Sequence, residues 1–201
     1  MCVLNACRSS IQSSAKIRIN TTVLADLSDT DQDTAMRVVD SLHAVLYISS
    51  KDDCVYWYHA SFPDFLSNPG QAKFHIPNYP ICEISVYFDT SVHHAILTHQ
   101  CFSIMEILHF NMCGLESSFV FDSDVSELND RKHKNLTLTL QYASRCWAKH
   151  LSQAVPAESD TNDLFLCLSN FMSDQLLFWI EVMNLIDAVF ECSPLLKDAK
   201  D

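Results

Sequence analysis

Apolar side chains recur every three or four positions across residues 31–46. Three aspartates, Asp29, Asp31 and Asp33, come at the start of this run, and acidic side chains favour the N-terminus of a helix. The spacing therefore predicts a helix near residues 31–44. The apolar positions that carry it are Ala35, Met36, Val38, Val39, Leu42 and Leu46.

Two short segments that follow are rich in β-branched and aromatic residues. AVLYI at 44–48 and CVYWYH at 54–59 are separated by the polar run SSKDD. This pattern predicts a β-hairpin with a longer loop. Val55, Trp57 and His59 alternate with two tyrosines, so we expect these three residues to share one face of a strand.

His59 stands where the second strand gives way to a predicted short helix. Ser61 and Asp64 fit a capping box, and Pro63 is tolerated because the first helical turn offers no partner to the N–H group that it lacks. Two roles for His59 remain open from these residues. It ties the strand to the helix, or it donates a hydrogen bond to an anion at the helix start.

The remainder of the chain predicts a connector and then helices only. Residues 67–80 hold three prolines and one glycine. Helical spacing follows in residues 89–110, 136–154, 161–172 and 174–190, and short links between consecutive helices predict an antiparallel bundle or a short superhelix. In the last helix we expect core packing, or as an alternative a groove for a partner, from Leu176, Leu177, Ile180, Met183, Asn184 and Ile186.

The predicted fold class is therefore mainly α. The order helix, hairpin, short helix is that of the second half of a winged helix. We expect a winged-helix subdomain with a small β-hairpin, followed by an antiparallel helical bundle or superhelical arm. The predicted division is a loose N-terminal segment (1–20), a partial winged helix (21–70), a connector (71–80) and a helical arm (81–201).

Composition supports a helical protein and argues against nucleic acid as a partner. Of the 201 residues 48% are hydrophobic, and with 2 glycines and 6 prolines the chain has few turn formers. The net charge of −12 opposes binding to phosphates. The helix before the hairpin would be the recognition helix of a DNA-binding winged helix, but residues 29–43 carry four aspartates and one arginine.

Cysteine usage and hydropathy predict a reduced, cytoplasmic protein. Nine cysteines are widely spaced and none forms a C-x-x-C pair. The first twenty residues lack the continuous apolar core of a signal peptide, and no apolar run is long enough to span a membrane. We therefore expect no membrane partner.

Neither a metal site nor a catalytic site is predicted. His93, His94, His99 and Cys101 lie within nine positions, but their spacing is not an established ligand pattern, and we expect them at surfaces or helix interfaces. No G-x-S-x-G nucleophile elbow occurs, and nothing selects one Cys–His pair from many. Neither Gly70 nor the other glycine of the chain is followed by the Lys-Ser or Lys-Thr of a P-loop. We therefore expect no ATP hydrolysis and no enzyme activity.

Several stretches together resemble one family. LHAVLYISSKDDCVYWYHASFPDFL resembles the winged-helix segment that follows the nucleotide-binding core in NACHT-type NTPases of the STAND class, NLR-like proteins, and is closest to the large NACHT sets of mushroom-forming fungi. HHAILTHQCFSIME, LHFNMCGLESSFVFDSDV, YASRCWAKHL and LLFWIEVMNLI resemble the same family in the same order. The resemblance covers about residues 35–192.

The resemblance implies a role for His59 as a contact to ADP. In such NTPases the histidine of the H-x-S-F motif contacts the β-phosphate of bound ADP, and His59 matches it within HASF. This role requires a nucleotide core, which this chain lacks. ADP and ATP are cofactors of the full-length family, and we expect none to be held by this chain, which resembles a fragment or a truncated gene product.

The resemblance implies a function in signal transduction without catalysis. We expect a regulatory or scaffold fragment that couples nucleotide state to a sensor domain, with a NACHT nucleotide core, sensor repeats or another protein as its partner. The alternative is a stand-alone helical protein-interaction module with no nucleotide role. A winged-helix DNA binder would need a basic face that the sequence does not offer.

Overall fold

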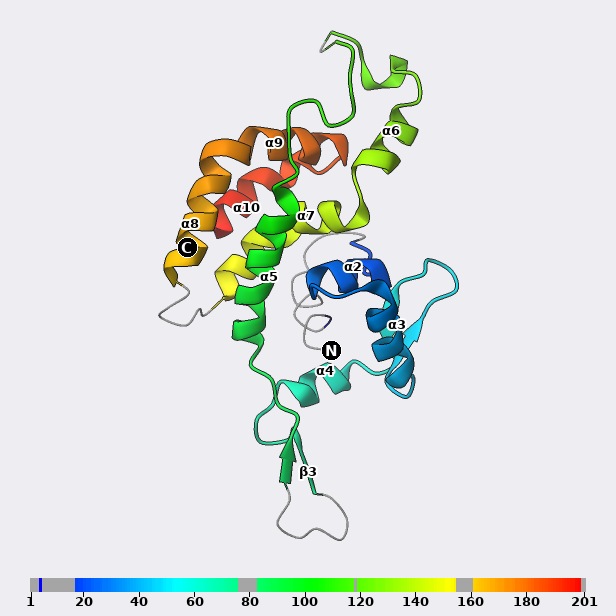
Figure 1. The fold of residues 1–201 in the computed structure, drawn as a ribbon, viewed down its shortest axis with the longest axis vertical. Helices are drawn as coiled ribbons and strands as arrows, with labels where there is room; N and C mark the ends of the chain where they lie inside the picture. The colour runs from blue at the N-terminus through cyan, green and yellow to red at the C-terminus, as the bar shows by residue number, and fades with distance from the viewer. Residues whose placement is uncertain (1–3, 5–16, 76–82, 118, 155–160, 200–201) are drawn as a thin grey trace.

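The computed structural model describes residues 4, 17–75, 83–117, 119–154 and 161–199. Across these ranges the chain is mainly helical and forms two small antiparallel β-hairpins (Figure 1). The predicted fold class, mainly α with a small β-hairpin, is confirmed.

Two capped helices open the fold. They are α2 (Thr21–Leu27) and α3 (Gln32–Ser41). Asn20 and Asp31 cap them, because a side-chain oxygen of each accepts the backbone N–H three residues further on, at 2.9 and 2.8 Å. The helix predicted near 31–44 is therefore confirmed, although it ends at Ser41. Seven residues are too few for a periodic pattern, so α2 was not predicted.

The predicted hairpin forms from β1 (Leu46–Ile48) and β2 (Val55–Trp57). The strands are antiparallel, with Leu46 opposite Trp57 and Ile48 opposite Val55. Leu46 and Val55 are buried in the core, whereas the intervening tyrosines face outward. The two faces of the hairpin, one buried and one exposed, are therefore those that the alternating pattern predicts.

A second hairpin lies where only a connector and helices were predicted. After α4 (Ser61–Leu66), strand β3 (Lys73–His75) pairs with β4 (Glu83–Ser85). The expectation of helices only after residue 80 is therefore wrong at β4. The prolines near these strands suggested a loop, so the pairing was not predicted.

Helices α5 (Thr90–Met105) and α7 (Leu138–Gln153) form the centre of the molecule (Figure 1). His94 lies against His150, and Phe102 lies against Trp147. Residue numbers increase along α5 while those of the contacted residues on α7 decrease, so the two helices are antiparallel. Both helices were predicted from helical spacing, and Asp89 and Thr137 cap them.

Between these two central helices the chain makes an excursion to one end of the molecule. A 3₁₀ turn (Asp122–Asp124) leads to α6 (Leu128–Asn135), which Figure 1 shows at the upper right, at about the height of α9. The turn at Asn111 is held by α9, because the Glu181 carboxylate accepts the backbone N–H groups of Asn111 and Met112 at 3.1 and 3.2 Å. A charged side chain within an apolar helix thereby satisfies two loop donors.

Helices α8 and α9 form one continuous helical segment, residues 161–185, which we call the C-terminal rod. A π-helical turn, Phe171–Gln175, links α8 (Thr161–Asn170) to α9 (Leu176–Leu185), so the two predicted helices share one backbone path. Trp179 is buried, whereas Leu177 and Asn184 are exposed, so the expected positions of these two residues in the packing face are wrong. Nearly every position of α9 is apolar, and periodicity could not select its buried face.

Helix α9 ends five residues earlier than predicted. Asp187 adopts a left-handed conformation with φ 58°, which reverses the chain after Leu185. A 3₁₀ turn (Val189–Glu191) and α10 (Cys192–Asp198) then bring the chain back against α7. This last helix was not predicted.

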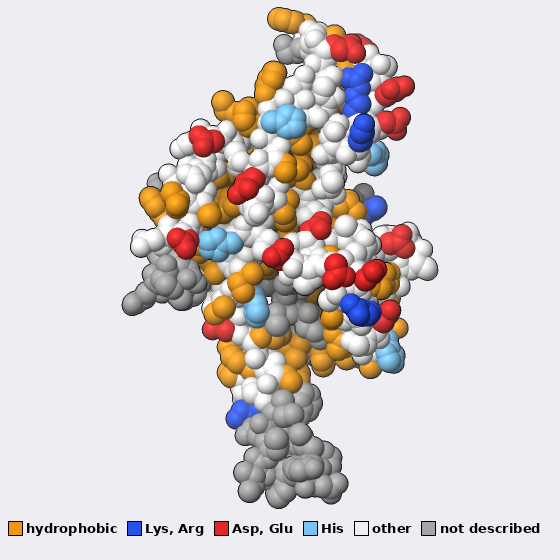
Figure 2. Space-filling model, in the orientation of Figure 1, with side chains coloured by type: hydrophobic (Ala, Val, Ile, Leu, Met, Phe, Trp, Pro, Cys, Tyr) orange, Lys and Arg blue, Asp and Glu red, His pale blue; other side chains and the backbone are white. Residues whose placement is uncertain are grey.

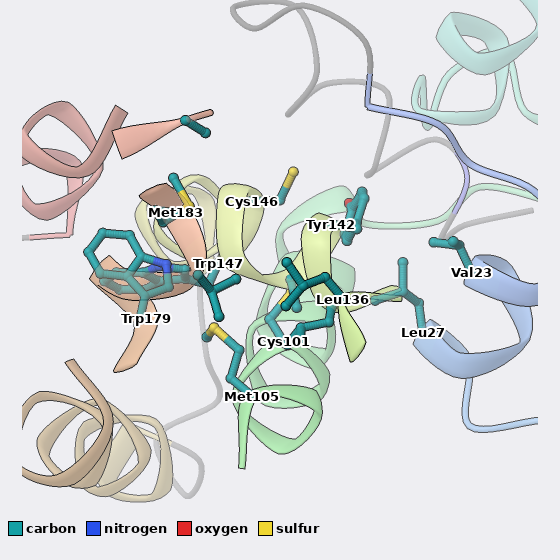
Figure 3. Close-up of a cluster of buried hydrophobic side chains, with 14 of the residues drawn as sticks. Val23, Leu27, Cys101, Met105, Leu136, Tyr142, Cys146, Trp147, Trp179 and Met183 are labelled. Atoms are coloured by element: carbon teal, nitrogen blue, oxygen red, sulfur yellow. The ribbon is translucent and has the colours of Figure 1, made fainter. Parts of the chain in front are cut away.

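One core runs through both the small subdomain formed by residues 21–70 and the helical arm formed by residues 81–201. Trp147, Phe171 and Trp179 form its aromatic centre, with ring centroids 5.0 to 5.9 Å apart. Figure 3 shows Val23 and Leu27 of α2 directed toward this cluster. The predicted boundary between the winged helix and the arm is therefore crossed by continuous apolar packing.

We expect Phe171→Ala to lower the free energy of unfolding by about 3–5 kcal/mol, because it leaves a cavity among the core aromatic rings. Phe165→Ala is the matched control in the same helical rod and should cost under about 0.5 kcal/mol. The two phenylalanines are 1% and 72% exposed. Urea denaturation measures both, and equal losses would contradict this core.

Candidate functional site

His59 lies on the surface and outside the strand on which it was predicted. Strand β2 ends at Trp57, and the last link to the first strand is the hydrogen bond from Tyr58 N–H to the Val45 carbonyl, 3.0 Å. Because β1 begins at Leu46, no strand residue stands opposite position 59. The expectation that His59 shares a face with Val55 and Trp57 is therefore wrong.

The helix after His59 begins without the predicted capping box. Ser61 is the first residue of α4, Ala60 occupies the cap position, and no side chain caps the helix. Within the described residues, His59 is linked to this helix through its backbone, whose carbonyl accepts the Phe62 N–H at 3.3 Å. The imidazole is exposed, and within the described residues it forms no hydrogen bond to the strand or to the helix. Its contact with an anion therefore stays a prediction.

Three tyrosines form an exposed surface next to His59, which we call the tyrosine face: Tyr47, Tyr56 and Tyr58. The Tyr47 ring lies 5.6 Å from that of Tyr56 and 4.8 Å from that of Tyr58. The Tyr56 hydroxyl donates to Asp52 at 2.8 Å, and this hydrogen bond raises the pKa of Tyr56 to about 12. The face is therefore neutral, aromatic and held in one arrangement.

A cleft between α5 and the C-terminal rod brings together two residues that are 68 positions apart. His99 Nδ1 lies 3.7 Å from Cys167 Sγ at its wall. Burial, followed by the charges of Asp163 and Glu106, raises the pKa of the Cys167 thiol. A protonated thiol is a poor nucleophile, so the pair does not have the chemistry of a Cys–His hydrolase. No sequence signal distinguished this pair from the other Cys–His combinations.

A pair of histidines lies inside the interface between α5 and α7. His94 and His150 are 3% and 0% exposed, and their Nδ1 atoms are 2.8 Å apart. His150 Nε2 lies 2.7 Å from the hydroxyl of the buried Tyr142. One Nδ1 must donate and the other accept, so both rings are satisfied when both are neutral. The sequence predicted His94 at a surface or a helix interface and indicated no partner for it.

The four residues considered for a metal site point to different neighbours. His93 packs edge-on against Phe88, His94 lies against His150, and Cys101 is buried in the core. Among the residues that the structure describes, no three His, Cys, Asp or Glu side chains are grouped so that they could hold a metal ion.

Comparisons with protein-family models, curated proteins and solved structures found no match for this chain. The resemblance to NACHT-type NTPases therefore stays a prediction. None of the helices in the described part of the chain is both long and apolar enough to cross a membrane.

We expect acid to destabilise the fold through the buried histidine pair. Burial lowers the pKa of His94 from 6.5 to about 4 and that of His150 to about 3. The unfolded chain therefore binds more protons below pH 6.5, and stability falls from there toward the folded-state values. One histidine accounts for a loss on the order of 2 kcal/mol between about pH 7 and pH 5.

Urea midpoints measured across this pH range test the role of the pair. His94→Gln should flatten the dependence, whereas the control His43→Gln, at an exposed position, should retain the slope of the native sequence. An unchanged slope in His94→Gln would show that other groups carry the acid sensitivity.

Proposed function

We propose that the chain is a non-catalytic regulatory or scaffold module of the NACHT type that acts in the cytoplasm. It docks through the hairpin and His59 on a nucleotide-binding core held by another protein or polypeptide segment. It then couples the nucleotide state of that core to sensor repeats or another protein through its helical arm. His59 contacts the phosphate of ADP bound in the partner core.

The observation that carries this proposal is the position of His59. Its imidazole is exposed at the joint between hairpin and α4, beside Tyr58, which is 59% exposed. A histidine that serves a phosphate held by a partner must face outward in the free chain. Exposed tyrosines next to it suit a protein interface, where tyrosine is enriched.

The connection between hairpin and arm supports a coupling role. Helix α2 lies between them: Leu27 is fully buried in the shared core, and the Thr139 hydroxyl of α7 donates to the Asp26 carboxylate. Leu46 and Val55 of the hairpin belong to the same core. Because close-packed interiors transmit displacement, a force on the hairpin is passed to α7.

The charge of the small subdomain favours a protein partner over nucleic acid. Helix α3 carries Asp33 and Asp40 against Arg37, and the turn of the hairpin adds Asp52 and Asp53 against one lysine. These carboxylates repel phosphate backbones. The phosphate in this proposal is reached by His59 alone, within a site whose cationic groups belong to the partner core.

A stand-alone helical protein-interaction module is the second candidate. Its support is that the aromatic centre of the core comes from α7 and the C-terminal rod, without the hairpin. In that case the chain would form a defined oligomer in solution and would not respond to nucleotide.

Calorimetric titration of the full chain with ADP should give no detectable heat. The chain has no P-loop, and its glycine-poor sequence offers no backbone cradle for phosphates. His59→Ala is titrated beside it. Saturable binding that disappears in His59→Ala would place a working phosphate site within this chain and would overturn the division between core and module.

Docking should depend on His59 and on nucleotide. We expect the chain to bind an ADP-loaded NACHT nucleotide core from a mushroom-forming fungus, and His59→Ala to weaken this binding about tenfold through loss of one charge-assisted hydrogen bond. His43→Ala removes another exposed histidine of the same subdomain and should change affinity less than about twofold. Equal effects of both variants, measured by surface plasmon resonance, would contradict the assignment.

A further inference from the structure

The cleft beside His99 and Cys167 has the size of a site for a small molecule. Its volume is about 300 Å³, at the lower end of the ~300–1,000 Å³ found for ligand pockets. Helix α5 forms one wall and the π-helical turn with the end of α8 forms the other. Phe102 and Phe171, which are almost fully buried, contribute to its lining.

The charged groups of this cleft are all carboxylates. Glu106 contributes one from α5 and Asp174 contributes the other from the π-helical turn, and no Lys or Arg lines the space. Neither carboxylate has a hydrogen bond or ion pair to another residue in the described ranges. Figure 2 likewise shows acidic side chains, without Lys or Arg, over the part of this face formed by α5 and α8.

The remaining lining narrows the chemistry of a ligand. Besides the histidine and the thiol, its polar groups are uncharged amides and a hydroxyl, which can accept hydrogen bonds from N–H or O–H donors. Burial is the main cause that raises the pKa of the Cys167 thiol, and the charges of Asp163 and Glu106 add to it, so the negative potential of these carboxylates acts on the cleft wall. A cation fits this potential, and an anion does not.

A metal ion is a poor match for the same space. The described residues place no three His, Cys, Asp or Glu side chains for joint coordination. The carboxylates lie on opposite walls, and the two phenylalanines, which are 5% and 1% exposed, add a little apolar surface to the lining, so the space suits a cation that carries its own carbon surface. Such a ligand offsets part of the charge of the two carboxylates and covers the small apolar surface of the lining at once.

We propose that this cleft binds a small organic ammonium ion, with Glu106 and Asp174 as its counter-charges. This function is separate from docking through His59 and goes beyond the function proposed above. Because the ligand bridges α5 and the π-helical turn, its binding stabilises the helical arm, and the gain rises with the logarithm of ligand concentration above Kd.

Choline is the first probe, with the full chain at constant ionic strength set by sodium chloride. We expect saturable binding by calorimetry and a rise in the thermal midpoint. Glu106→Gln or Asp174→Asn should each weaken affinity about threefold to fivefold, as removal of one partly exposed charge does. Both side chains are exposed, so the variants are expected to fold, and circular dichroism verifies this.

The controls separate a built site from general attraction. Asp130→Asn removes the same charge from α6, away from the cleft, and should leave choline affinity unchanged. The neutral isostere 3,3-dimethyl-1-butanol should not bind measurably. Equal binding of the isostere, equal loss in Asp130→Asn, an equal response to calcium chloride, or no saturation by choline up to about 10 mM would each overturn the proposal.

Discussion

Burial of α7 on several sides at once is the constraint on which the rest of the structure depends. More than half of its residues are buried, and it packs against α2, α5, α9 and α10. A helix with this many neighbours cannot present polar side chains to water on most of its surface. Several polar groups on it find a partner on a neighbouring element, and those partners fix how the elements are arranged. The buried Ser144 hydroxyl and Trp147 indole N–H have no hydrogen-bond partner among the described residues.

The partners of α7 lie on three different elements. Thr139 donates to Asp26 of α2, Arg145 forms a two-point ion pair with Glu191 just before α10, and His150 contacts a histidine of α5. Each contact is satisfied in only one relative position of its two elements. Apolar packing alone would tolerate sliding between helices, whereas these contacts select one register. The acid sensitivity of the buried histidines is a consequence of this same selection.

The sequence predicted the elements whose signals are local. The helices that became α3, α5 and α7 followed from helical spacing, and the first hairpin followed from its aromatic strands. The prolines of the predicted connector obscured the second hairpin. Helix α10 has seven residues and depends on packing against α7, so no local pattern marked it. Likewise, the sequence identified His59 by motif but not its surroundings, and it had no means of joining His99 to Cys167 across 68 positions.

The two proposed sites are connected to α7 by different routes. The hairpin reaches α7 through α2, whose Leu27 sits in the shared core. The cleft reaches it through Phe171, which lines the cleft and also contacts the Trp147 ring at 5.0 Å between centroids. The π-helical turn departs from regular α-helical hydrogen bonding at this residue, and such turns occur often at functional sites. A ligand that fixes the turn would therefore stiffen the element that docking displaces, and the two events would be coupled through α7 even though no residue belongs to both sites.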